Sequence, residues 1–597
     1  MNRKLVMAAI VVCALVASAV PAAGARPLAV KVKDTKVQLL AINDFHGHIE
    51  PNTPGTIQVG QRLGTGAEPR VVNLTVPAGG AEYLATHVKA LRATNSNTIT
   101  VGSGDLIGAS PLTSALFHDE PAIEALNVVG IDVSGVGNHE FDEGLAELYR
   151  MLNGGCHPVD GCQDGDSFLG ALFQYLAANV FFVGTNTTVL PAYEVRKVGN
   201  AKIAFIGLTL EGTPLIVTPS AIAGLEFRDE IETVNALVTK LRNEQGVRAF
   251  VVLLHQGGFQ NPPFSNATPN PNPALALPGW AGINSCDNMT GEIVAIANGL
   301  SDNVDVIVSG HTHAQYICAG AKEIDGKVVT SASSFGRLVT DIDLVIDHQT
   351  KDVKSATARN VIVTQDVAKH PAVTAIVNKY KAIAAPIANR IVGRITADLL
   401  SSRDAGGGNA AGESALGDVI ADAQLEATTP TDFGASVVAF MNPGGIRAPL
   451  LFNASAGGEA PGEVTYGEIF TVQPFGNTLV VKTCTGAQIQ ALLDQQFVVA
   501  RTLQISSTLH YSWASSRPAG DKVVDSTVMI QGVAVNSAAP YRVTMNSFLA
   551  DGGDGFSVFR DCTNQLGGEV DVDALGRYFM AHSPISPPPL DRITKID

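Results

Sequence analysis

The sequence predicts an α/β protein with two large domains, and three observations support this prediction. Between about residues 34 and 363, short apolar runs alternate with helical stretches, which is the pattern of βαβ units. From about 389 to 597, helical segments are mixed with short strands and glycine-rich turns. The chain of 597 residues is also longer than one hydrophobic core usually supports. An amphipathic helix within 364–388 is expected to join the two domains as a hinge.

The first 25 residues have the pattern of a secretory signal peptide. Arg3 and Lys4 precede the apolar run Leu5–Val20, and small residues follow up to Ala25. This run is short for a membrane-spanning helix, so we expect cleavage rather than anchoring. The segment SPPPLDRITKID at the C-terminus has no hydrophobic tail. The sequence therefore predicts a secreted or periplasmic protein without a stable membrane anchor.

Composition and charge narrow the classes of partner. Hydrophobic residues make up 46% of the chain and charged residues 16%, as in ordinary globular proteins. The net charge of −16 argues against binding to nucleic-acid polymers or to anionic membranes. An anionic substrate would need a local site made by metals and arginines. The composition leaves the oligomeric state open.

Six cysteines follow the predicted signal peptide, and an even number in an exported chain indicates disulfide bonds. Six free buried thiols are the alternative. A cysteine metal site is disfavoured because no C-x-x-C spacing occurs. The expected pairs are Cys156–Cys162 around a short loop, Cys286–Cys318 and Cys484–Cys562.

Five apolar runs lead directly into short clusters of polar residues that can bind metals. Each run is typical of a buried parallel strand, and α/β sheets bind ligands outside the carboxyl ends of their strands. Side chains from five strand ends are therefore expected to converge on one site, most simply a pair of divalent metals. The expected ligands are Asp44, His46, Asp105, Asn138, His255, His311 and His313.

The spacing and type of these residues suit transition metals. In the motifs D-x-H at 44–46 and H-x-H at 311–313, an extended chain would point both side chains to the same side. Glycines before Asp105 and Asn138 permit sharp turns and close backbone approach. The mixture of imidazoles, carboxylates and an amide suits Zn²⁺, Mn²⁺, Fe or Co²⁺ and has too much nitrogen for Ca²⁺ or Mg²⁺ alone. Two cations about 3.5–4 Å apart can stabilise both the attacking and the leaving oxygen of a displacement.

His139 is a candidate catalytic residue because it follows Asn138 and cannot face the same metal equally. Asp142 lies three residues later, in what we expect to be the first turn of a helix. This carboxylate can orient the imidazole and favour its protonated form. A protonated His139 could stabilise a transition state or protonate a leaving alkoxide. The alternative is a structural role. The first domain therefore predicts a metal-dependent hydrolase, with a phosphoester as the favoured substrate bond.

The second domain has four segments with residues that suit a nucleotide. Arg447 follows a Gly-Gly turn, where backbone N–H groups and a guanidinium could bind phosphate. Arg403 lies beside a flexible loop, and Phe475 lies in a glycine-bounded turn. Phe548 precedes a glycine-rich loop that contains Asp554. Two aromatic rings can sandwich a base, with about 1–3 kcal/mol per stacked base. Core phenylalanines and solvated arginines are the alternative.

The order of motifs resembles the calcineurin-like metallophosphoesterases, and nearly the whole mature chain resembles the secreted 5′-nucleotidase family. That family includes UDP-sugar hydrolases and 2′,3′-cyclic phosphodiesterase/3′-nucleotidases. The shared motifs, in family order, are NDFHG, GSGD, GNHEFD, GHTH, NPGGIR, PFGN and GGDGF. The resemblance implies a four-layer α/β/β/α metallophosphoesterase domain, followed by a smaller α/β nucleotide-binding domain. We expect these domains at 34–363 and 389–597.

The resemblance also implies roles for individual residues. It assigns the first metal to Asp44, His46, Asp105 and His313. It assigns the second metal to Asp105, Asn138, His255 and His311, with Asp105 bridging. It implies phosphate or ribose contacts from Asn442, Gly445 and Arg447, base stacking by Phe475 and Phe548, and a hydrogen bond from the ribose or base to Asp554. The segment AGGGNAAG separates Arg403 from the next family motif, NPGG replaces NGGG, and PFGN replaces PFGG.

The sequence therefore predicts a secreted phosphohydrolase with two divalent metals that releases nucleoside and phosphate from nucleoside 5′-monophosphates. Cyclic nucleotides, 3′-nucleotides and UDP-sugars are alternative substrates, since the metals define only phosphoester cleavage. A nucleotide-binding surface protein without activity and a protein phosphatase or adhesion protein are alternatives from other classes. The expected partner is a small nucleotide.

Overall fold

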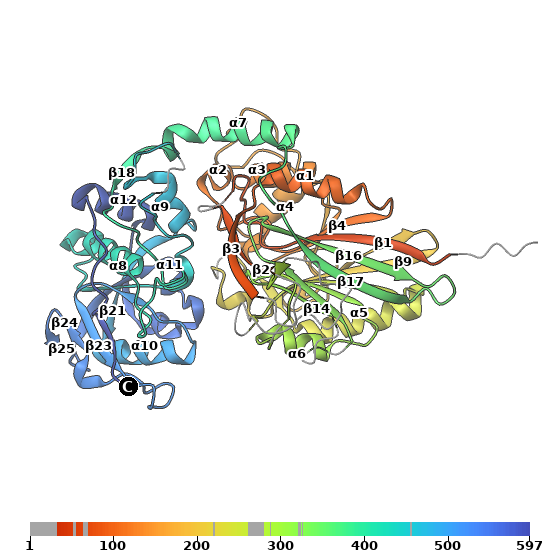
Figure 1. Cartoon of the computed structure of the whole chain (residues 1–597). Coiled ribbons are helices and arrows are strands. Elements are labelled where there is room, and N and C mark those ends of the chain that lie inside the picture. The colour runs from red at the N-terminus through yellow and green to blue at the C-terminus, as the bar shows by residue number, and fades with distance from the viewer. Residues whose placement is uncertain are drawn as a thin grey trace, which may run out of the picture.

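The computed structural model describes residues 33–51, 55–63, 70–218, 221–260, 280–286, 288–319, 324, 326–453 and 457–597. The predicted signal peptide and the Asn/Pro-rich segment 261–279 lie outside these residues. Two domains lie side by side, and helix α7 (Pro371–Ala388) runs along one edge from the first to the second (Figure 1). Within the described ranges, no helix combines the length and the apolar character that a membrane crossing requires.

The N-terminal domain contains two six-stranded sheets. The strands of the first sheet, in spatial order, are β17 (Val353–Ile362), β16 (Leu338–Ile346), β1 (Thr35–Ile42), β4 (Thr98–Ser103), β5 (Val133–Gly135) and β6 (Gln174–Leu176). Those of the second are β14 (Gln315–Ala319), β15 (Val328–Ala332), β13 (Val306–Ser309), β11 (Ala249–His255), β9 (Ala201–Thr209) and β8 (Tyr193–Val198). Both sheets have a parallel centre, because β1, β4 and β5 run parallel in the first and β9, β11 and β13 in the second.

The two sheets pack face to face, and helices cover their outer faces. One apolar core, which includes Leu39, Val101 and Val251, lies between the sheets. Leu40, the next residue along β1, packs instead under helices α1 (Ala81–Arg92), α3 (Glu120–Val129) and α4 (Leu145–Asn153). Helices α5 (Glu230–Gln245) and α6 (Glu292–Gly299) cover the second sheet. The predicted four-layer α/β/β/α architecture is confirmed.

The central strands are apolar along their whole length because both of their faces are buried. This explains why the five apolar runs of the sequence do not alternate with polar residues. All five runs form strands, but they divide between the sheets: β1, β4 and β5 belong to the first, and β11 and β13 to the second. Smaller elements extend the domain: the three-stranded sheet of β2 (Thr56–Leu63), β3 (Arg70–Pro77) and β12 (Trp280–Ala281), and the antiparallel pair of β7 (Val180–Phe182) and β10 (Leu225–Phe227).

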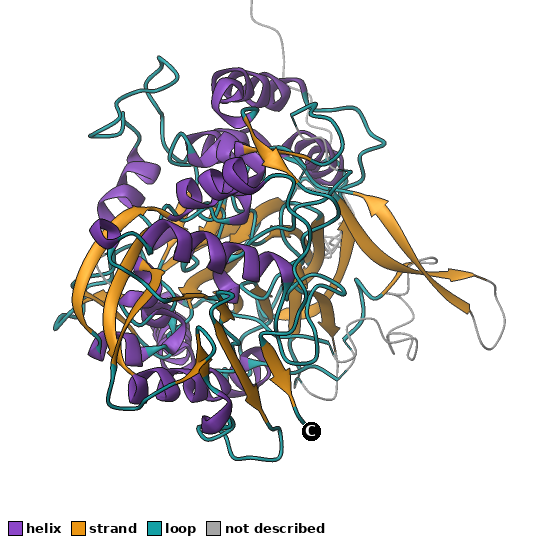
Figure 2. Cartoon of the chain, turned by 90° about the vertical axis from the view of Figure 1, so that its left-hand side faces the viewer, coloured by secondary structure: helices purple, strands orange, loops and turns teal. Residues whose placement is uncertain are grey.

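The C-terminal domain is built on a five-stranded sheet. Its strands, in spatial order, are β22 (Gln504–Ile505), β19 (Val438–Met441), β26 (Pro540–Asn546), β21 (Thr478–Thr485) and β27 (Thr563–Val570). Its main helices are α8 (Ala415–Thr428), α9 (Tyr466–Val472), α10 (Gly486–Val498) and α12 (Asp571–His582). Figure 2 shows these helices packed around the strands, with the domain facing the viewer. The predicted second α/β domain is confirmed.

Helix α7 differs from its prediction at its C-terminal end. The sequence predicts a helix over 369–387 that Pro386 closes, but α7 extends from Pro371 to Ala388 and Pro386 lies inside it. Proline lacks one N–H donor, and so close to the end this removes a single helical bond. The N–H of Asn389 still donates to the carbonyl of Ala385, which caps the helix beyond the proline. Helix α7 packs on α1 and α3 of one domain and on α9 of the other.

The three predicted disulfide pairs are confirmed. They link Cys156 to Cys162, Cys286 to Cys318 and Cys484 to Cys562, with Cα atoms 4.7, 5.1 and 4.7 Å apart. The first closes a surface loop that follows α4. The second joins β14 to the segment before α6, and the third joins the end of β21 to the start of β27.

Candidate metal and nucleotide site

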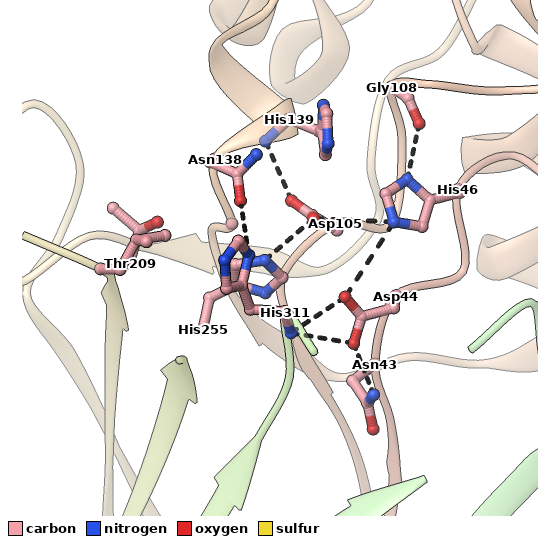
Figure 3. Close-up of polar contacts among 12 residues, drawn as sticks. Asn43, Asp44, His46, Asp105, Gly108, Asn138, His139, Thr209, His255 and His311 are labelled. Atoms are coloured by element: carbon pink, nitrogen blue, oxygen red, sulfur yellow. Dashed lines mark hydrogen bonds and ion pairs between the residues drawn. The ribbon is translucent and has the colours of Figure 1, made fainter. Parts of the chain in front are cut away.

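The carboxyl ends of β1, β4, β5, β11 and β13, with the loops that follow them, bring together all seven predicted metal ligands. Figure 3 labels Asp44, His46, Asp105, Asn138, His255 and His311 among them. The structure groups them into two clusters of ligand atoms. One consists of Asp44, His46 and His313, and the other of Asp105, His255 and His311. A further group of ligand atoms combines His46 and Asp105 with His139. Asn138 joins the second cluster, since its side-chain oxygen lies 3.1 Å from Nδ1 of His311. The two sheets face each other, so strand ends from both can supply a single centre.

Asp105 lies between the two clusters. Its Oδ2 is 2.9 Å from Nε2 of His255 and 3.6 Å from Nε2 of His46. Its Oδ1 accepts the backbone N–H of His139 at 2.9 Å. The carboxylate is buried, so its charge is poorly solvated and needs cationic partners. This position is the one that a bridging ligand would occupy.

The donor atoms of these histidines fit divalent cations. Nδ1 of His255 donates to the carbonyl of Ser103 at 2.8 Å, and Nδ1 of His46 donates to that of Gly108 at 2.8 Å. In a neutral ring, a proton on Nδ1 leaves the lone pair of Nε2 for a cation. Nε2 of His255 is buried, and although Oδ2 of Asp105 lies 2.9 Å away, the two atoms do not meet the geometry of a hydrogen bond. Burial also lowers the pKa of His46 and of His313 well below the usual value, so both rings are neutral.

The backbone at these residues differs from the extended chain that the two-residue spacing suggested. Asp44, His46, Asp105, His311 and His313 all have positive φ, between 48° and 70°. The reason is geometric: each chain must turn sharply as it leaves the sheet edge, and left-handed residues produce that turn. Non-glycine residues adopt this conformation at a cost of about 1–3 kcal/mol, which is characteristic of functional sites.

Glu140 holds two of the ligand loops together. Its carboxylate accepts the backbone N–H groups of Asp105, Leu106 and Gly137 at 2.9, 2.8 and 2.5 Å. These bonds link the loop after β4 to the loop after β5. The residue is therefore a positioning group for Asp105.

Gly137 allows the same two loops to approach each other. A Cβ atom at Gly137 would lie 2.5 Å from the backbone nitrogen of Asp105. We expect Gly137→Ala to displace Asp105, to destabilise the fold by about 1–3 kcal/mol and to weaken metal binding at least about 10-fold. Denaturant unfolding and metal titration measure the two effects. Gly567→Ala is the control, because a Cβ there would meet no atom within 4 Å, and equal effects of both substitutions would contradict this role.

His139 and Asp142 form the predicted pair. The ring donates from Nδ1 to Oδ2 of Asp142 at 2.7 Å. His139 is the first residue of a 3₁₀ turn, η1 (His139–Phe141), and Asp142 follows it, so the pair does not lie in the first turn of a helix; α4 begins only at Leu145. Burial opposes the charged form of His139, but the negative charges of Asp142 and Asp105 outweigh it and raise its pKa above the usual value. The ring is thus held in a form that can donate a proton.

A cavity of about 850 Å³ lies between the two domains. From the N-terminal domain it is lined by Asp105, Asn138, His139, Asp142, His311 and His313. All seven predicted substrate-binding residues line it from the other side: Arg403, Asn442, Gly445, Arg447, Phe475, Phe548 and Asp554. The ring of Phe475 stacks on that of His139 with centroids 5.6 Å apart. The structure therefore brings together residues more than 400 positions apart in the sequence.

Two arginines of the C-terminal domain line the cavity. Neither Arg403 nor Arg447 forms an ion pair within the part of the chain that the structure describes. Burial and the nearby charge of Arg403 lower the pKa of Arg447 to about 10, which still leaves it charged at neutral pH. The guanidinium of Arg447 lies 5.7 Å from the centre of the Phe475 ring. Two uncompensated cations that face a cavity indicate an anionic ligand.

Arg501 also lines the cavity, and sequence reasoning missed it. It forms an ion pair with Asp554, whose other carboxylate oxygen accepts from Nδ2 of Asn442 at 2.8 Å. Asp554 is buried and has a φ of 57°. Arg501 lies in the segment VVARTLQIS, which has none of the glycines that marked the other candidate residues. Only the fold brings it to Asp554.

Comparison with known proteins gives two family matches. The calcineurin-like phosphoesterase family model matches residues 37–315, and the model of the 5′-nucleotidase C-terminal domain matches 391–561. The chain therefore belongs to the 5′-nucleotidase family, in which a metal-dependent phosphoester hydrolase domain precedes this C-terminal domain.

Several individual proteins are similar to the chain. Endonuclease YhcR of Bacillus subtilis is 32% identical over 86% of this chain and 37% of its own length. Cell wall protein Lmo0130 of Listeria monocytogenes is 33% identical over 88% of this chain and 64% of its own. The chain thus spans less than two thirds of these two relatives. A 5′-nucleotidase of Vibrio cholerae is 24% identical over 98% of both chains.

A solved structure supports the fold. The 5′-nucleotidase precursor of Thermus thermophilus superimposes with a TM-score of 0.71 and 24% identity, covering 94% of this chain and all of that one. The agreement covers both domains and confirms the two-domain α/β architecture.

Proposed function

We propose that the protein hydrolyses nucleoside 5′-monophosphates to nucleoside and phosphate. The observation that supports this most is the shared cavity. In it, two His/Asp clusters of the N-terminal domain face two unpaired arginines and two phenylalanines of the C-terminal domain. A nucleotide needs these three features, since cations act on the phosphoryl group, guanidinium groups bind the phosphate and aromatic rings stack on the base.

In this proposal the two clusters would hold two divalent cations, and Asp105 would be a ligand in both sets. The first cation is assigned to Asp44, His46, Asp105 and His313, and the second to Asp105, Asn138, His255 and His311. Cations bound there would supply Lewis acidity and lower the pKa of an attacking water. The mixture of imidazole, carboxylate and amide donors favours Zn²⁺ or Mn²⁺.

The chain's own groups bind and orient the nucleotide. Arg403 and Arg447 bind the phosphate, with Asn442 and Gly445 beside it. Protonated His139, held by Asp142, donates to the phosphoryl group or to the leaving 5′ oxygen. Asp554, which forms an ion pair with Arg501, accepts a hydrogen bond from the ribose or base. Phe475 and Phe548 stack on the base.

A substrate panel tests this proposal. Purified protein with Mn²⁺ or Zn²⁺ is assayed for phosphate release from AMP, 3′-AMP, 2′,3′-cyclic AMP, UDP-glucose and p-nitrophenyl phosphate. A phosphatase added to the cyclic AMP and UDP-glucose samples reveals masked phosphate. The proposal expects the highest kcat/KM for AMP. Metal-loaded protein that binds AMP without cleaving any substrate would instead indicate a nucleotide-capturing surface protein.

A second candidate substrate class is favoured by the size of the cavity. Small-molecule sites usually measure about 300–1,000 Å³, so 850 Å³ leaves room for a nucleotide diphosphate sugar as well as for AMP. The similarity to a protein named as an endonuclease adds a single-stranded oligonucleotide to the panel. A higher kcat/KM for UDP-glucose or for the oligonucleotide than for AMP would identify that compound as the preferred substrate of the same site.

The stacking role of Phe475 and Phe548 gives a specific expectation. Replacing both with alanine should raise KM for AMP by about 10-fold or more, because each stacked ring contributes about 1–3 kcal/mol. KM for p-nitrophenyl phosphate should change much less, because that substrate has no base. Steady-state kinetics on both substrates measure the difference, and equal increases for the two would contradict the stacking role.

Export from the cytoplasm is proposed from the N-terminal segment and from three disulfides in the described structure. Disulfides of this kind persist in oxidising compartments. N-terminal sequencing of the protein recovered from outside the cytoplasm tests the proposal, with residue 26 expected as the first.

A further inference from the structure

A second cavity, of about 460 Å³, lies between the two domains beside helix α7, and we call it the α7 cavity. Residues of α7, of the loop after β1, of the turn before β16 and of the C-terminal domain line it. His313, Arg403 and Arg447 line this cavity as well as the first one. The two cavities therefore adjoin each other at a predicted metal ligand and at the two arginines assigned to the substrate phosphate.

Arg337, just before β16, lines the α7 cavity as a cation without an ion pair among the residues that the structure describes. A guanidinium has five N–H groups. Its Nε donates to the carbonyl of Ser334 at 3.0 Å, and two other N–H groups donate to Oγ of Ser334 and to the carbonyl of Thr56 at 2.5 and 3.4 Å. Two N–H groups thus remain for a ligand. Burial lowers the pKa of Arg337 to about 10, which leaves it charged at neutral pH.

Neighbouring rings hold this guanidinium in place. It lies 5.1 Å from the centre of the Phe335 ring. That ring stacks on the imidazole of His48, with centroids 3.9 Å apart and planes at 24°. Burial lowers the pKa of His48 to about 3, so its ring adds no charge. A cation held by an aromatic ring and by three hydrogen bonds is already oriented for an anion.

The carboxylates that line the α7 cavity are engaged elsewhere. Glu50 forms an ion pair with Lys381 of α7. Asp404 accepts from the N–H and the hydroxyl of Ser401, both at 2.8 Å. Glu468 accepts from the N–H and the hydroxyl of the N-cap threonine of α9. Three guanidinium groups therefore border the cavity without an ion pair in the described structure, and unpaired charges removed from water are costly.

We propose that the α7 cavity is a second anion site, in which Arg337 binds inorganic phosphate, the product of the proposed reaction. Phosphate oxygens accept paired hydrogen bonds from a guanidinium, and Arg403 and Arg447 contribute positive charge from the shared wall. The cavity has room for the ion and several waters, since one water occupies about 30 Å³. The role of phosphate as a product rests on the proposed function, whereas the binding of phosphate does not.

The shared arginines give this site an effect on the reaction. A phosphate at Arg337 can bind while a nucleotide occupies the first cavity. It then competes for the charge of Arg403 and Arg447, which the transferred phosphoryl group needs. We therefore expect phosphate to inhibit AMP hydrolysis in two ways: by competition at the metal clusters, and by a lower apparent kcat through the α7 cavity.

Equilibrium dialysis of the metal-loaded protein against labelled phosphate tests the site without requiring turnover. The wild type should bind two phosphate ions per chain, one at the metal clusters and one at Arg337. Arg337→Gln should bind one, because an uncharged amide replaces the guanidinium. Ala385→Glu should also bind one. Ala385 lines the cavity from α7, so a glutamate there adds a negative charge and leaves every hydrogen bond of Arg337 in place.

Ala382→Glu is the matched control. Ala382 is an exposed residue of the same helix and lines neither cavity, so this variant has the same added charge and should bind two phosphate ions. Equal numbers of bound ions in the wild type, Arg337→Gln and Ala385→Glu would overturn the proposal, and so would the same loss in Ala382→Glu. Two bound ions in a wild type that cleaves no nucleotide, with one in both cavity variants, would support this site and contradict the proposed function.

Adenosine release from AMP at increasing phosphate concentrations tests the effect on the reaction. In the wild type, phosphate should raise the apparent KM and lower the apparent kcat. In Arg337→Gln, the inhibition constant for the decrease in kcat should rise at least about 10-fold, since a hydrogen-bonded charge is lost. The competitive component should remain, because the metal clusters are intact. Purely competitive inhibition of the wild type would overturn the inhibitory role of the site.

Discussion

Replacing His139 with alanine is expected to lower kcat for phosphate release from AMP by about 10²–10⁴-fold, the usual contribution of a positioned acid or base. The reason is local. Asp142 holds the ring at 2.7 Å and, with Asp105, raises its pKa, so His139 enters the cavity as a proton donor. No other histidine in the described part of the cavity lining has such a carboxylate partner outside the metal clusters.

Metal content separates this role from a structural one. His139→Ala should retain both metals, since the expected ligand at this turn is Asn138 and the side chain of His139 is not needed. Stopped assays for kcat and elemental analysis on the same preparation provide the two readouts. His87→Ala, a partly buried histidine on α1 that contacts the carbonyl of Thr364, is the control and should keep wild-type kcat. Unchanged kcat in His139→Ala would contradict the assignment.

Asp105→Asn is expected to lower kcat for AMP by an amount comparable to that of His139→Ala, but through weaker metal binding. The carboxylate contacts His46, His255 and the backbone of His139, so it lies between the two clusters. An amide of the same shape lacks the charge that two cations require. We expect affinity for both metals and kcat for AMP to fall by about 100-fold or more.

Asp132→Asn is the matched control for this substitution. Asp132 immediately precedes β5, at the amino end of the sheet, and its carboxylate pairs with Arg92 and Arg196. Its replacement removes two partly exposed ion pairs but no cavity contact, so metal content should stay at the wild-type value. Metal titration of both variants gives the comparison. An Asp105→Asn protein that loses only one metal would show that Asp105 does not bridge.

Much of the fold could be predicted from the sequence because the apolar pattern of each segment agrees with the burial of the strand that it forms. The runs VQLLAI and VVLL are apolar throughout, which is typical of strands buried on both faces, and β1 and β11 are such strands. The division into two facing sheets followed from family resemblance and not from the pattern, since parallel strands of one or two sheets look alike. Pro386 was misplaced because the cost of a proline depends on its distance from the helix end.

The candidate site was predicted best where a short polar motif follows an apolar run. All seven expected metal ligands and the His139–Asp142 pair come together as predicted, because strand ends of facing sheets share an edge. The left-handed backbone at Asp44 and His311 was not predicted, since spacing carries no information about φ. Arg501 was missed because its contact with Asp554 depends on the packing of the C-terminal domain and not on any local motif.

The central claim is that cations at the strand ends and the C-terminal arginines act on one nucleotide. Phosphate release from AMP tests it most directly, measured on the purified protein as prepared, after EDTA, and after Mn²⁺ or Zn²⁺ is restored. We predict that EDTA abolishes release and that the added metal restores it, while Arg447→Ala remains weak under all conditions because KM for AMP rises. Release that is unaffected by EDTA, or wild-type KM in Arg447→Ala, would contradict the claim.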